Sequence, residues 1–125
     1  MTVKVLVVDD EEDIRDALEA ELVSVDYDTV VLENGENIVN TALKTRPDVI
    51  VLDLMMPKVN GYEAIGALKA ESRTKLIPVI VASAATRNGI LTAVRELGAI
   101  DFLCKPWGEV ELIWRIDHAI GSVAA

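Results

Sequence analysis

Residues 5–10 read VLVVDD, four aliphatic residues followed by two aspartates. A short run rich in Val and Leu is typical of a strand buried on both faces of a parallel sheet. Three later runs also end at a polar side chain: residues 49–52 lead into Asp53, 79–82 into Ser83 and 100–104 into Lys105. Because the carboxyl ends of parallel strands meet at one edge of the sheet, where ligands bind, we expect these side chains to share one crevice.

Strand and helix patterns alternate along the chain. Apolar runs predict strands over residues 3–8, 28–32, 48–52, 77–82 and 100–104. Apolar residues at helical spacing predict helices over residues 14–25, 38–43, 64–68, 91–97 and 109–121. Gly89 argues for a late start of the fourth helix or for a mobile helix, because glycine costs about 1 kcal/mol in a helix interior. Five such units predict an α/β three-layer sandwich in one domain over residues 1–125, with an ordered core over 1–121.

The chain is strongly acidic. It has 12 basic and 21 acidic residues and a net charge of −9, which disfavours nucleic acid as a partner and favours a cation or a protein with a basic patch. Cys104 is the only cysteine, so an internal disulfide is excluded, and a reducing compartment fits. No apolar stretch reaches the roughly 18 residues of a membrane span, and the N-terminal pattern is that of a strand. We therefore expect a cytoplasmic protein that does not enter a membrane.

The expected crevice would hold three carboxylates, those of Asp9, Asp10 and Asp53. At about 4 Å each pair repels by about 4 kcal/mol, on the order of 10 kcal/mol in all, so a cation is needed. Oxygen ligands at an open, wet edge favour Mg²⁺, which takes one or two carboxylates and keeps several waters. The alternative is that Asp9 and Asp10 only cap the following helix, which accounts for one aspartate but not for two.

Asp53 follows the central strand of the predicted sheet. A carboxylate near a divalent ion and an ammonium group can attack a phosphoryl group and carry it as an acyl phosphate. The ion and Lys105 would neutralise the phosphoryl oxygens, and Ser83 would hydrogen-bond one of them. Taken singly, Ser83 could be a helix N-cap and Lys105 a surface lysine. Their positions after buried strands favour the site.

Four motifs carry a resemblance to a known family. They are VDDE at residues 8–11, DLMMP at 53–57 followed by Asn60-Gly61, ASA at 82–84 and FLCKP at 102–106. In this order and spacing they are similar to the receiver domains of two-component response regulators, the CheY-like superfamily, over essentially the whole chain. The resemblance implies a flavodoxin-like sandwich with five helices and a five-stranded parallel sheet in the strand order 2-1-3-4-5.

The resemblance also implies roles for single residues. Asp53 matches the aspartate that a histidine kinase phosphorylates, and Lys105 matches the invariant lysine of the family. Asp10, Asp53 and the backbone carbonyl of Met55 match the protein ligands of Mg²⁺. Asp9 matches an acid that acts on the ion through water.

Further positions bear on switching and on the lifetime of the phosphorylated state. Ser83 and Phe102 match a hydroxyl that moves toward the phosphoryl group and an aromatic ring that swings inward with it. The Lys105-Pro106 peptide bond is expected to be cis, as in relatives. Met55 and Ala85 are apolar at two variable positions of the family and cannot position an attacking water. We therefore expect a long-lived acyl phosphate in the absence of a phosphatase.

The implied function is a switch in phosphorelay signal transduction rather than an enzyme. Asp53 would accept a phosphoryl group, in a Mg²⁺-dependent reaction, from a sensor histidine kinase or a phosphotransfer protein. The face built from the fourth helix, the fifth strand and the fifth helix would then change shape and control an output protein or effector domain. We expect no effector domain within the 125 residues, and both a stand-alone receiver and a part of a longer protein stay open.

Other functions could use the same residues. A Mg²⁺-dependent phosphohydrolase would also form an aspartyl phosphate, but such enzymes usually carry a second aspartate where this chain has Met55. An interaction module that is independent of phosphorylation would not need the complete site. A nucleotide-binding domain is disfavoured because no Gly-rich loop follows the first strand.

The last predicted helix carries an aromatic residue off its core-facing stripe. At 100° per residue, that stripe contains Leu112, Ile113, Ile116, Ala119, Ile120 and Val123. Trp114 falls on the opposite side, near Val110, and either packs under a neighbouring helix or anchors a partner or a second copy. Arg115 and Asp101 are similar to part of the charged set in dimerising regulators of this family, so a homodimer is a further hypothesis. His118, the only histidine, is expected to be solvated and far from the crevice.

Overall fold

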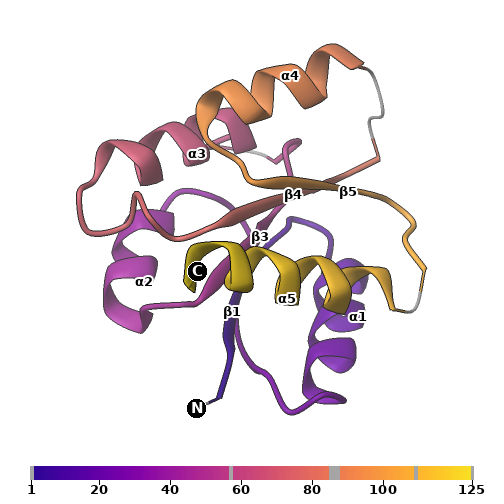
Figure 1. Ribbon diagram of the computed structural model, residues 1–125. Helices are drawn as coiled ribbons and strands as arrows, with labels where there is room; N and C mark the ends of the chain where they lie inside the picture. Colours follow the sequence, from indigo (N-terminus) through magenta and orange to yellow (C-terminus); the bar gives the residue numbers. More distant parts are fainter. Residues whose placement is uncertain (1, 57, 85–87, 109, 125) are drawn as a thin grey trace.

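The computed structural model describes residues 2–56, 58–84, 88–108 and 110–124. In these residues, strands and helices alternate from one end to the other (Figure 1). The strands are β1 (Lys4–Val8), β2 (Asp28–Leu32), β3 (Val49–Leu52), β4 (Val79–Ser83) and β5 (Asp101–Cys104). The helices are α1 (Glu12–Val23), α2 (Ile38–Thr45), α3 (Gly61–Ala70), α4 (Asn88–Leu97) and α5 (Glu111–Ala124). None of these helices has the length and apolar character that crossing a bilayer requires.

The five strands form one parallel sheet in the order β2-β1-β3-β4-β5. The predicted flavodoxin-like order 2-1-3-4-5 is therefore confirmed. The order in which strands are added to the sheet reverses at β1. The second strand, β2, lies on one side of β1, and the third, β3, lies on the other. In parallel sheets of this kind the ends of the two strands beside such a reversal leave a crevice between their loops. Asp9 and Asp10 follow β1, and Asp53 follows β3.

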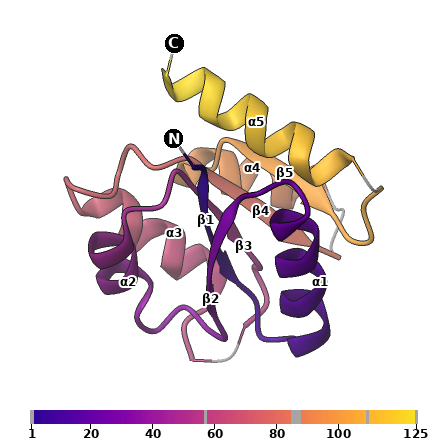
Figure 2. The same ribbon diagram turned by 90° about the horizontal axis from the view of Figure 1, so that it is seen from below.

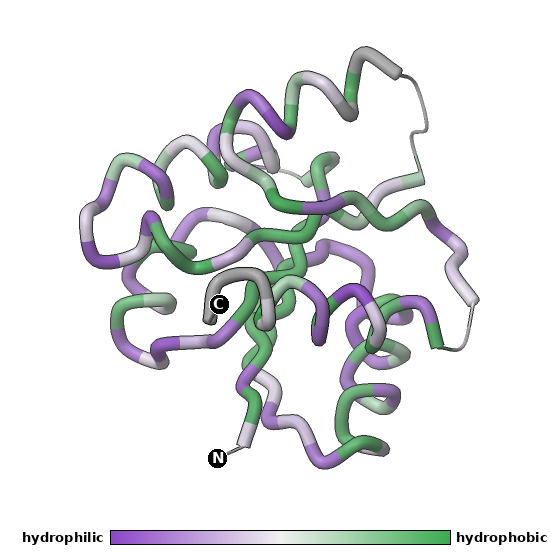
Figure 3. The backbone as a smooth tube through the Cα atoms, in the orientation of Figure 1, coloured by the Kyte–Doolittle hydropathy of each residue, from purple (hydrophilic) through white to green (hydrophobic). Residues whose placement is uncertain are grey.

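Helices cover both faces of the sheet, which makes the sandwich three layers thick (Figure 2). Alternate side chains of each strand point to opposite faces. In β1, Leu6 and Val8 pack with α2, α3 and α4, whereas Val5 and Val7 pack with α1 and α5. The same alternation in β3 and β4 fills two apolar clusters, one on each face. The apolar stretches of the tube accordingly converge on the central strands (Figure 3).

Most elements have boundaries that differ by a few residues from those expected; α1, for example, covers Glu12–Val23 instead of residues 14–25. The fourth helix begins at Asn88 rather than near residue 91. Gly89 then lies in the first turn, where backbone N–H groups lack helical partners in any case, so the cost of glycine is smaller there than in a helix interior. The fourth strand begins at Val79, directly after Pro78, and includes Ser83. The last helix covers Glu111–Ala124 instead of residues 109–121.

The core-facing stripe of α5 is confirmed for the side chains that the structure describes. Leu112, Ile116 and Ala119 are buried against the sheet, and Ile113 and Ile120 pack at the edge of the same cluster. The side chain of Val123 lies outside the described set.

Candidate functional site

A crevice of about 550 Å³ opens at the carboxyl edge of the sheet. Its lining residues come from the ends of β1, β3, β4 and β5, and they are Asp10, Glu11, Asp53, Met55, Ser83, Ala84 and Lys105. The polar side chains that follow the four apolar runs of the sequence thus meet in one place. Asp9 lies directly beneath them and is only 1% exposed.

Backbone hydrogen bonds extend the sheet one residue beyond its strands and so fix the site residues. The N–H of Asp9 donates to the carbonyl of Leu32 at 3.1 Å, and that of Asp53 donates to the carbonyl of Val8 at 2.9 Å. The N–H of Lys105 donates to the carbonyl of Ser83 at 3.0 Å. These side chains therefore start from a rigid backbone rather than from a mobile loop.

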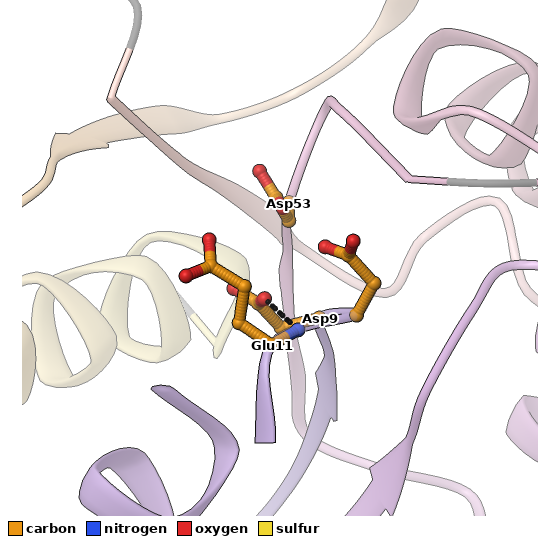
Figure 4. Close-up of side chains that lie close together, drawn as sticks. Asp9, Glu11 and Asp53 are labelled. Atoms are coloured by element: carbon orange, nitrogen blue, oxygen red, sulfur yellow. Dashed lines mark hydrogen bonds between the residues drawn. The ribbon is translucent and has the colours of Figure 1, made fainter. Parts of the chain in front are cut away.

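Four carboxylates gather at this edge. One oxygen each of Asp9, Asp10, Glu11 and Asp53 lies within 4.8 Å of the others, and Figure 4 shows the groups of Asp9, Glu11 and Asp53 side by side. Glu11 is the member that sequence reasoning does not assign to the site. The available signal was its position directly after Asp9 and Asp10, in the VDDE motif.

Asp9 is the structural centre of the cluster. Its Oδ2 accepts a hydrogen bond from Lys105 Nζ at 2.7 Å, and its Oδ1 accepts one from the N–H of Glu11 at 2.9 Å. Its backbone carbonyl accepts a hydrogen bond from Arg15 Nη1 at 2.8 Å. The N-cap residue of α1 is Glu11, and its own side chain makes no capping hydrogen bond. The interpretation that Asp9 and Asp10 only cap this helix is wrong, because both belong to the acid cluster.

Lys105 is surrounded by acids. Its Nζ lies 3.7 Å from Asp53 Oδ2 and 3.9 Å from Glu11 Oε1, besides its bond to Asp9, and its side chain is only 11% exposed. Burial alone would lower the pKa of this ammonium group. The hydrogen bond to Asp9 and the charges of Asp53, Asp9 and Glu11 outweigh that effect and raise the pKa. Lys105 is therefore a fixed positive charge inside the crevice, not a surface lysine.

Asp53 carries the most perturbed carboxylate of the site. Burial raises its pKa to about 6 from an ordinary value of 3.8, against the lowering effect of Lys105, and the charges of Asp9 and Asp10 raise it further. The side chain is 5% exposed. A carboxylate in this setting is ionised at neutral pH but poorly solvated, and a poorly solvated anion is a better nucleophile than a hydrated one.

The loop after β3 holds Asp53 in place. The N–H of Met55 donates to Asp53 Oδ1 at 3.4 Å. The N–H of Gly61 donates to the carbonyl of Leu54 at 2.8 Å, and Asn60 Oδ1 caps α3 by accepting from the N–H of Glu63 at 3.0 Å. A Cβ at Gly61 would lie 2.7 Å from the carbonyl oxygen of Asp53, so this helix start can approach the loop only because residue 61 is a glycine.

The two candidate switch residues lie on neighbouring strands. Ser83 is buried as the last residue of β4, five residues before α4 begins, so it is not the N-cap of that helix. Phe102 in β5 is half-buried and packs against the apolar cluster beneath α2, α3 and α4. The Lys105-Pro106 peptide bond is cis, as expected. Ala85 lies outside the described residues.

The donor set of the crevice fits a hard divalent cation. All of the clustered donors are carboxylate oxygens, which is the ligand type of Mg²⁺ and Ca²⁺ rather than of a softer transition metal. Asp10 and Glu11 are exposed, whereas Asp9 and Asp53 are buried. Because two of the four carboxylates are exposed, water can reach the site and supply the water ligands that Mg²⁺ retains. One lysine does not balance four carboxylates, so a cation would lower the electrostatic energy of the site.

Trp114 lies on the solvent side of α5, which excludes the alternative that it packs under a neighbouring helix. The indole is 59% exposed and does not pack under a neighbouring helix. It stacks on His118, with ring centroids 5.0 Å apart. Arg115 Nη1 lies 2.8 Å from Asp101 Oδ1 within the same chain.

Comparison with known proteins identifies relatives over almost the whole chain. Residues 5–117 match the family described as "Response regulator receiver domain". The chain is 38% identical over 120 residues to "Probable transcriptional regulator ycf27" of Porphyridium aerugineum, which covers 96% of this chain and 49% of that protein. It is 36% identical over 116 residues to "Response regulator PleD" of Caulobacter vibrioides, which covers 93% of this chain and 26% of that protein. The chain thus spans about half or less of the length of these relatives.

Solved structures agree with this assignment. The chemotaxis protein CheY4 of Vibrio cholerae superimposes with a TM-score of 0.90 at 28% identity, over 95% of this chain and 99% of that one. The receiver domain of the sensor histidine kinase PA1611 of Pseudomonas aeruginosa gives a TM-score of 0.89 at 27% identity, over 97% and 99% of the two chains. That structure is described with a magnesium ion coordinated in the active-site cleft.

Proposed function

Since the chain belongs to the response regulator receiver domain family, we propose that Asp53 accepts a phosphoryl group in a Mg²⁺-dependent reaction and that the phosphorylated chain controls an output partner. The observation that carries this proposal is the buried Asp53 carboxylate, with Lys105 Nζ at 3.7 Å and three further carboxylates around it. A nucleophile, a fixed cation and a metal-binding acid cluster are what phosphoryl transfer to a carboxylate requires.

The transfer itself is a displacement at phosphorus. A carboxylate oxygen of Asp53 forms a P–O bond, while the P–N bond of a phosphohistidine donor breaks and its electron pair stays on the imidazole nitrogen. The product is an acyl phosphate on Asp53. Because the pKa of Asp53 is about 6, the carboxylate is mostly ionised at pH 7 and needs no general base.

The other residues of the crevice would stabilise the transferred group. The Lys105 ammonium group would donate a hydrogen bond to one phosphoryl oxygen, and the Ser83 hydroxyl would donate a hydrogen bond to another. Asp10, Asp53 and the backbone carbonyl of Met55 would hold Mg²⁺, with Asp9 acting through water. The ion would supply positive charge against the phosphoryl oxygens.

The phosphodonor protein would dock beside the crevice. A groove of about 490 Å³ there has apolar walls from Ile14 and Ala17 of α1 and from Pro106 and Trp107 after β5. Its lining also includes Glu11, Glu21, Ala84 and Lys105. Its mostly apolar walls suit a helix of a sensor histidine kinase or of a phosphotransfer protein, which must bring its histidine to Asp53.

The output would be a shift in the pairing of β4 with β5. Ser83 lies opposite Cys104 and Val81 lies opposite Phe102 in this pair. A displacement of Ser83 toward a phosphoryl group would therefore reach β5 and the neighbouring helices α4 and α5, where an output protein or effector domain would bind.

Labelling with a small donor tests the proposal directly. Incubation with acetyl phosphate and Mg²⁺ should add one phosphoryl group by intact-mass analysis, since the P–O bond to acetate can break in the same displacement. Asp53→Asn and removal of Mg²⁺ with a chelator should both prevent the addition. Asp28→Asn, at an exposed aspartate of β2, should leave it unchanged. Labelling of Asp53→Asn, or an unlabelled wild type with both acetyl phosphate and phosphorylated kinases, would refute the proposal.

The competing function is a phosphohydrolase that turns over. Met55 stands where such enzymes carry their second aspartate, and its exposed thioether lines the crevice without an ionisable group. We therefore propose a switch rather than an enzyme. Sustained release of phosphate from a phosphomonoester, beyond one equivalent per chain, would favour the hydrolase instead.

A further inference from the structure

A second groove, separate from the crevice, runs between α1 and α5. Its volume is about 340 Å³. Its floor is apolar and consists of Val25 after α1, Val110 before α5, and Ile113 and Trp114 of α5. None of the residues that line this groove lines the phosphoacceptor crevice.

The floor of the groove is unusually exposed for apolar side chains. Val110 is 78% exposed, Trp114 59% and Val25 39%. Single apolar residues are common on protein surfaces, but a contiguous group that includes tryptophan marks a binding surface. Among the described residues, Leu76 is exposed to a similar degree, at 76%, yet it lines neither this groove nor the crevice.

The rim of the groove is acidic. Glu21 and Asp117 line it, and no lysine or arginine is found among the described residues of its lining. Glu21 Oε2 accepts a hydrogen bond from Trp107 Nε1 at 3.3 Å. Glu21 Oε1 is the one buried side-chain oxygen or nitrogen without a hydrogen-bond partner in the described part of the chain. A buried carboxylate oxygen without a donor is costly, and positive charge brought close by a bound partner would lower the energy of the Glu21 carboxylate.

Asp117 is held in place on the opposite wall. It accepts a hydrogen bond from the hydroxyl of Tyr27, and this bond raises the pKa of Tyr27 to about 12. The Tyr27 proton therefore stays in place over the physiological pH range. Both walls thus present fixed negative charge to whatever occupies the groove.

The negative charge of the rim indicates which kind of molecule can bind in the groove. A second copy of the chain would bring Glu21 and Asp117 of one molecule near the acidic rim of the other, in a protein of net charge −9. A nucleic acid would meet the same repulsion. A basic segment with an apolar face meets an apolar floor and an acidic rim, so its charge and its hydrophobicity both match.

We propose that the groove between α1 and α5 binds a basic amphipathic helix of a partner protein. Apolar residues at helical spacing on one face of that helix cover Trp114 and Val110. Lysine or arginine side chains beside them pair with Glu21 and Asp117. The described residues of this surface do not line the crevice, so a phosphoryl group on Asp53 would not block it, whereas Glu21 is shared with the groove proposed for the phosphodonor.

A pair of synthetic helices tests the proposal. The probe has leucine on one face and lysine elsewhere, and its counterpart has glutamate in place of every lysine. Titration of the ¹⁵N-labelled chain, followed by amide chemical shifts, should show shifts from the lysine probe along α1 and α5 around the groove. The glutamate probe should cause none. Shifts scattered over other faces, equal binding of both probes or no binding of the lysine probe would overturn the proposal.

Matched variants locate the contact. Trp114→Ala should weaken binding of the lysine probe by at least roughly tenfold, as expected for the loss of a central aromatic anchor. Leu76→Ala, at an exposed apolar residue outside the groove, should leave the affinity unchanged. Glu21→Gln should weaken binding, whereas Glu96→Gln on the exposed side of α4 should not. Because Trp114 is exposed, its variant should keep the wild-type melting temperature and the labelling of Asp53. Equal affinities of Trp114→Ala and the wild type would contradict the assignment.

Discussion

Lys105 Nζ lies 2.7 Å from Asp9 Oδ2 but 3.7 Å from Asp53 Oδ2. The lysine is therefore hydrogen-bonded to the acid beneath the crevice and only within ion-pair distance of the acid that faces it. This division of contacts keeps the ammonium group fixed while the Asp53 carboxylate stays available for chemistry. It also makes Lys105 necessary for stability, because two buried carboxylates depend on it.

Replacement of Lys105 by methionine should destabilise the fold. The Asp9 and Asp53 carboxylates would stay buried without their cation, and breaking such a pair costs about 3 kcal/mol or more of unfolding free energy. Urea denaturation at pH 7 without divalent ions measures this loss. Lys58→Met is the matched control, because Lys58 pairs with Glu36 at 3.3 Å on the surface, where both side chains are more than half exposed. A loss for Lys105→Met no larger than that of the control would contradict the assignment.

The raised pKa of Asp53 should make stability depend on pH. Its pKa is about 6 in the folded chain against an ordinary value of 3.8, so the folded state holds this proton more tightly than the unfolded state. The contribution of Asp53 to stability is therefore present at low pH and is lost as the pH rises from about 4 to about 6. Without divalent ions, Asp53→Asn should gain about 3 kcal/mol over the wild type at pH 7.

The gain of Asp53→Asn should fall toward zero at pH 4, where the wild-type carboxyl group is protonated in the folded state. Urea denaturation at pH 4, 5 and 7 measures the trend. Asp28→Asn, at an exposed site, should show no such dependence. A gain for Asp53→Asn that does not change with pH would show that burial of the charge is not its cause.

Magnesium should stabilise the chain through the acid cluster. A ligand that binds only the folded state at ten times its Kd adds about 1.4 kcal/mol, which raises the melting temperature. Asp10→Asn should remove most of this increase because Asp10 belongs to the cluster. Glu12→Gln, which changes an acid in the first turn of α1 outside the cluster, should respond to Mg²⁺ as the wild type does. Thermal melts with Mg²⁺ and with a chelator provide the comparison.

Gly61 and Gly66 should respond in opposite ways to alanine. A Cβ at Gly61 would lie 2.5 Å from Leu54 Cα and 2.7 Å from the Asp53 carbonyl oxygen, both backbone atoms. Gly61→Ala should therefore cost about 1–3 kcal/mol of unfolding free energy and slow the labelling of Asp53 by acetyl phosphate. A Cβ at Gly66 meets nothing within 4 Å, so Gly66→Ala in the middle of α3 should gain about 1 kcal/mol. Equal effects of the two changes would argue against close packing at the phosphoacceptor loop.

Met55 should set the lifetime of the acyl phosphate. Its side chain is 71% exposed at the crevice and cannot hydrogen-bond an attacking water. Met55→Asn supplies an amide there and should accelerate dephosphorylation by roughly tenfold. Leu76→Asn, at another exposed apolar residue, should leave the rate unchanged. Equal decay rates of Met55→Asn and the wild type, followed by intact mass after removal of the donor, would dispose of the idea.

The sheet and the membership of the crevice could be predicted because both depend on short-range patterns. Runs such as residues 5–8 and 49–52 are apolar at every position, which identifies strands buried on both faces. Parallel pairing then places the residues after those strands on one edge. This reasoning needs only the order of apolar and polar residues along the chain, and it is independent of how any side chain is oriented.

The finer arrangement depends on contacts that no local pattern encodes. Glu11 joins the acid cluster because of the turn that Asp9 Oδ1 makes with its N–H, whereas the sequence pattern places Glu11 only at the start of the following helix. The preference of Lys105 for Asp9 over Asp53 is set by packing between distant parts of the chain. The exposure of Trp114 likewise depends on how α1 and α5 cross, which helical periodicity alone does not determine.

The hydrogen bond between Lys105 and Asp9 joins positions 96 residues apart in the chain. Neither an amino-terminal nor a carboxyl-terminal fragment can therefore assemble the reactive centre by itself. Truncation before β5 should abolish chemistry outright instead of merely reducing it. Labelling of Asp53 therefore reports on molecules in which the first and the last strand have come together.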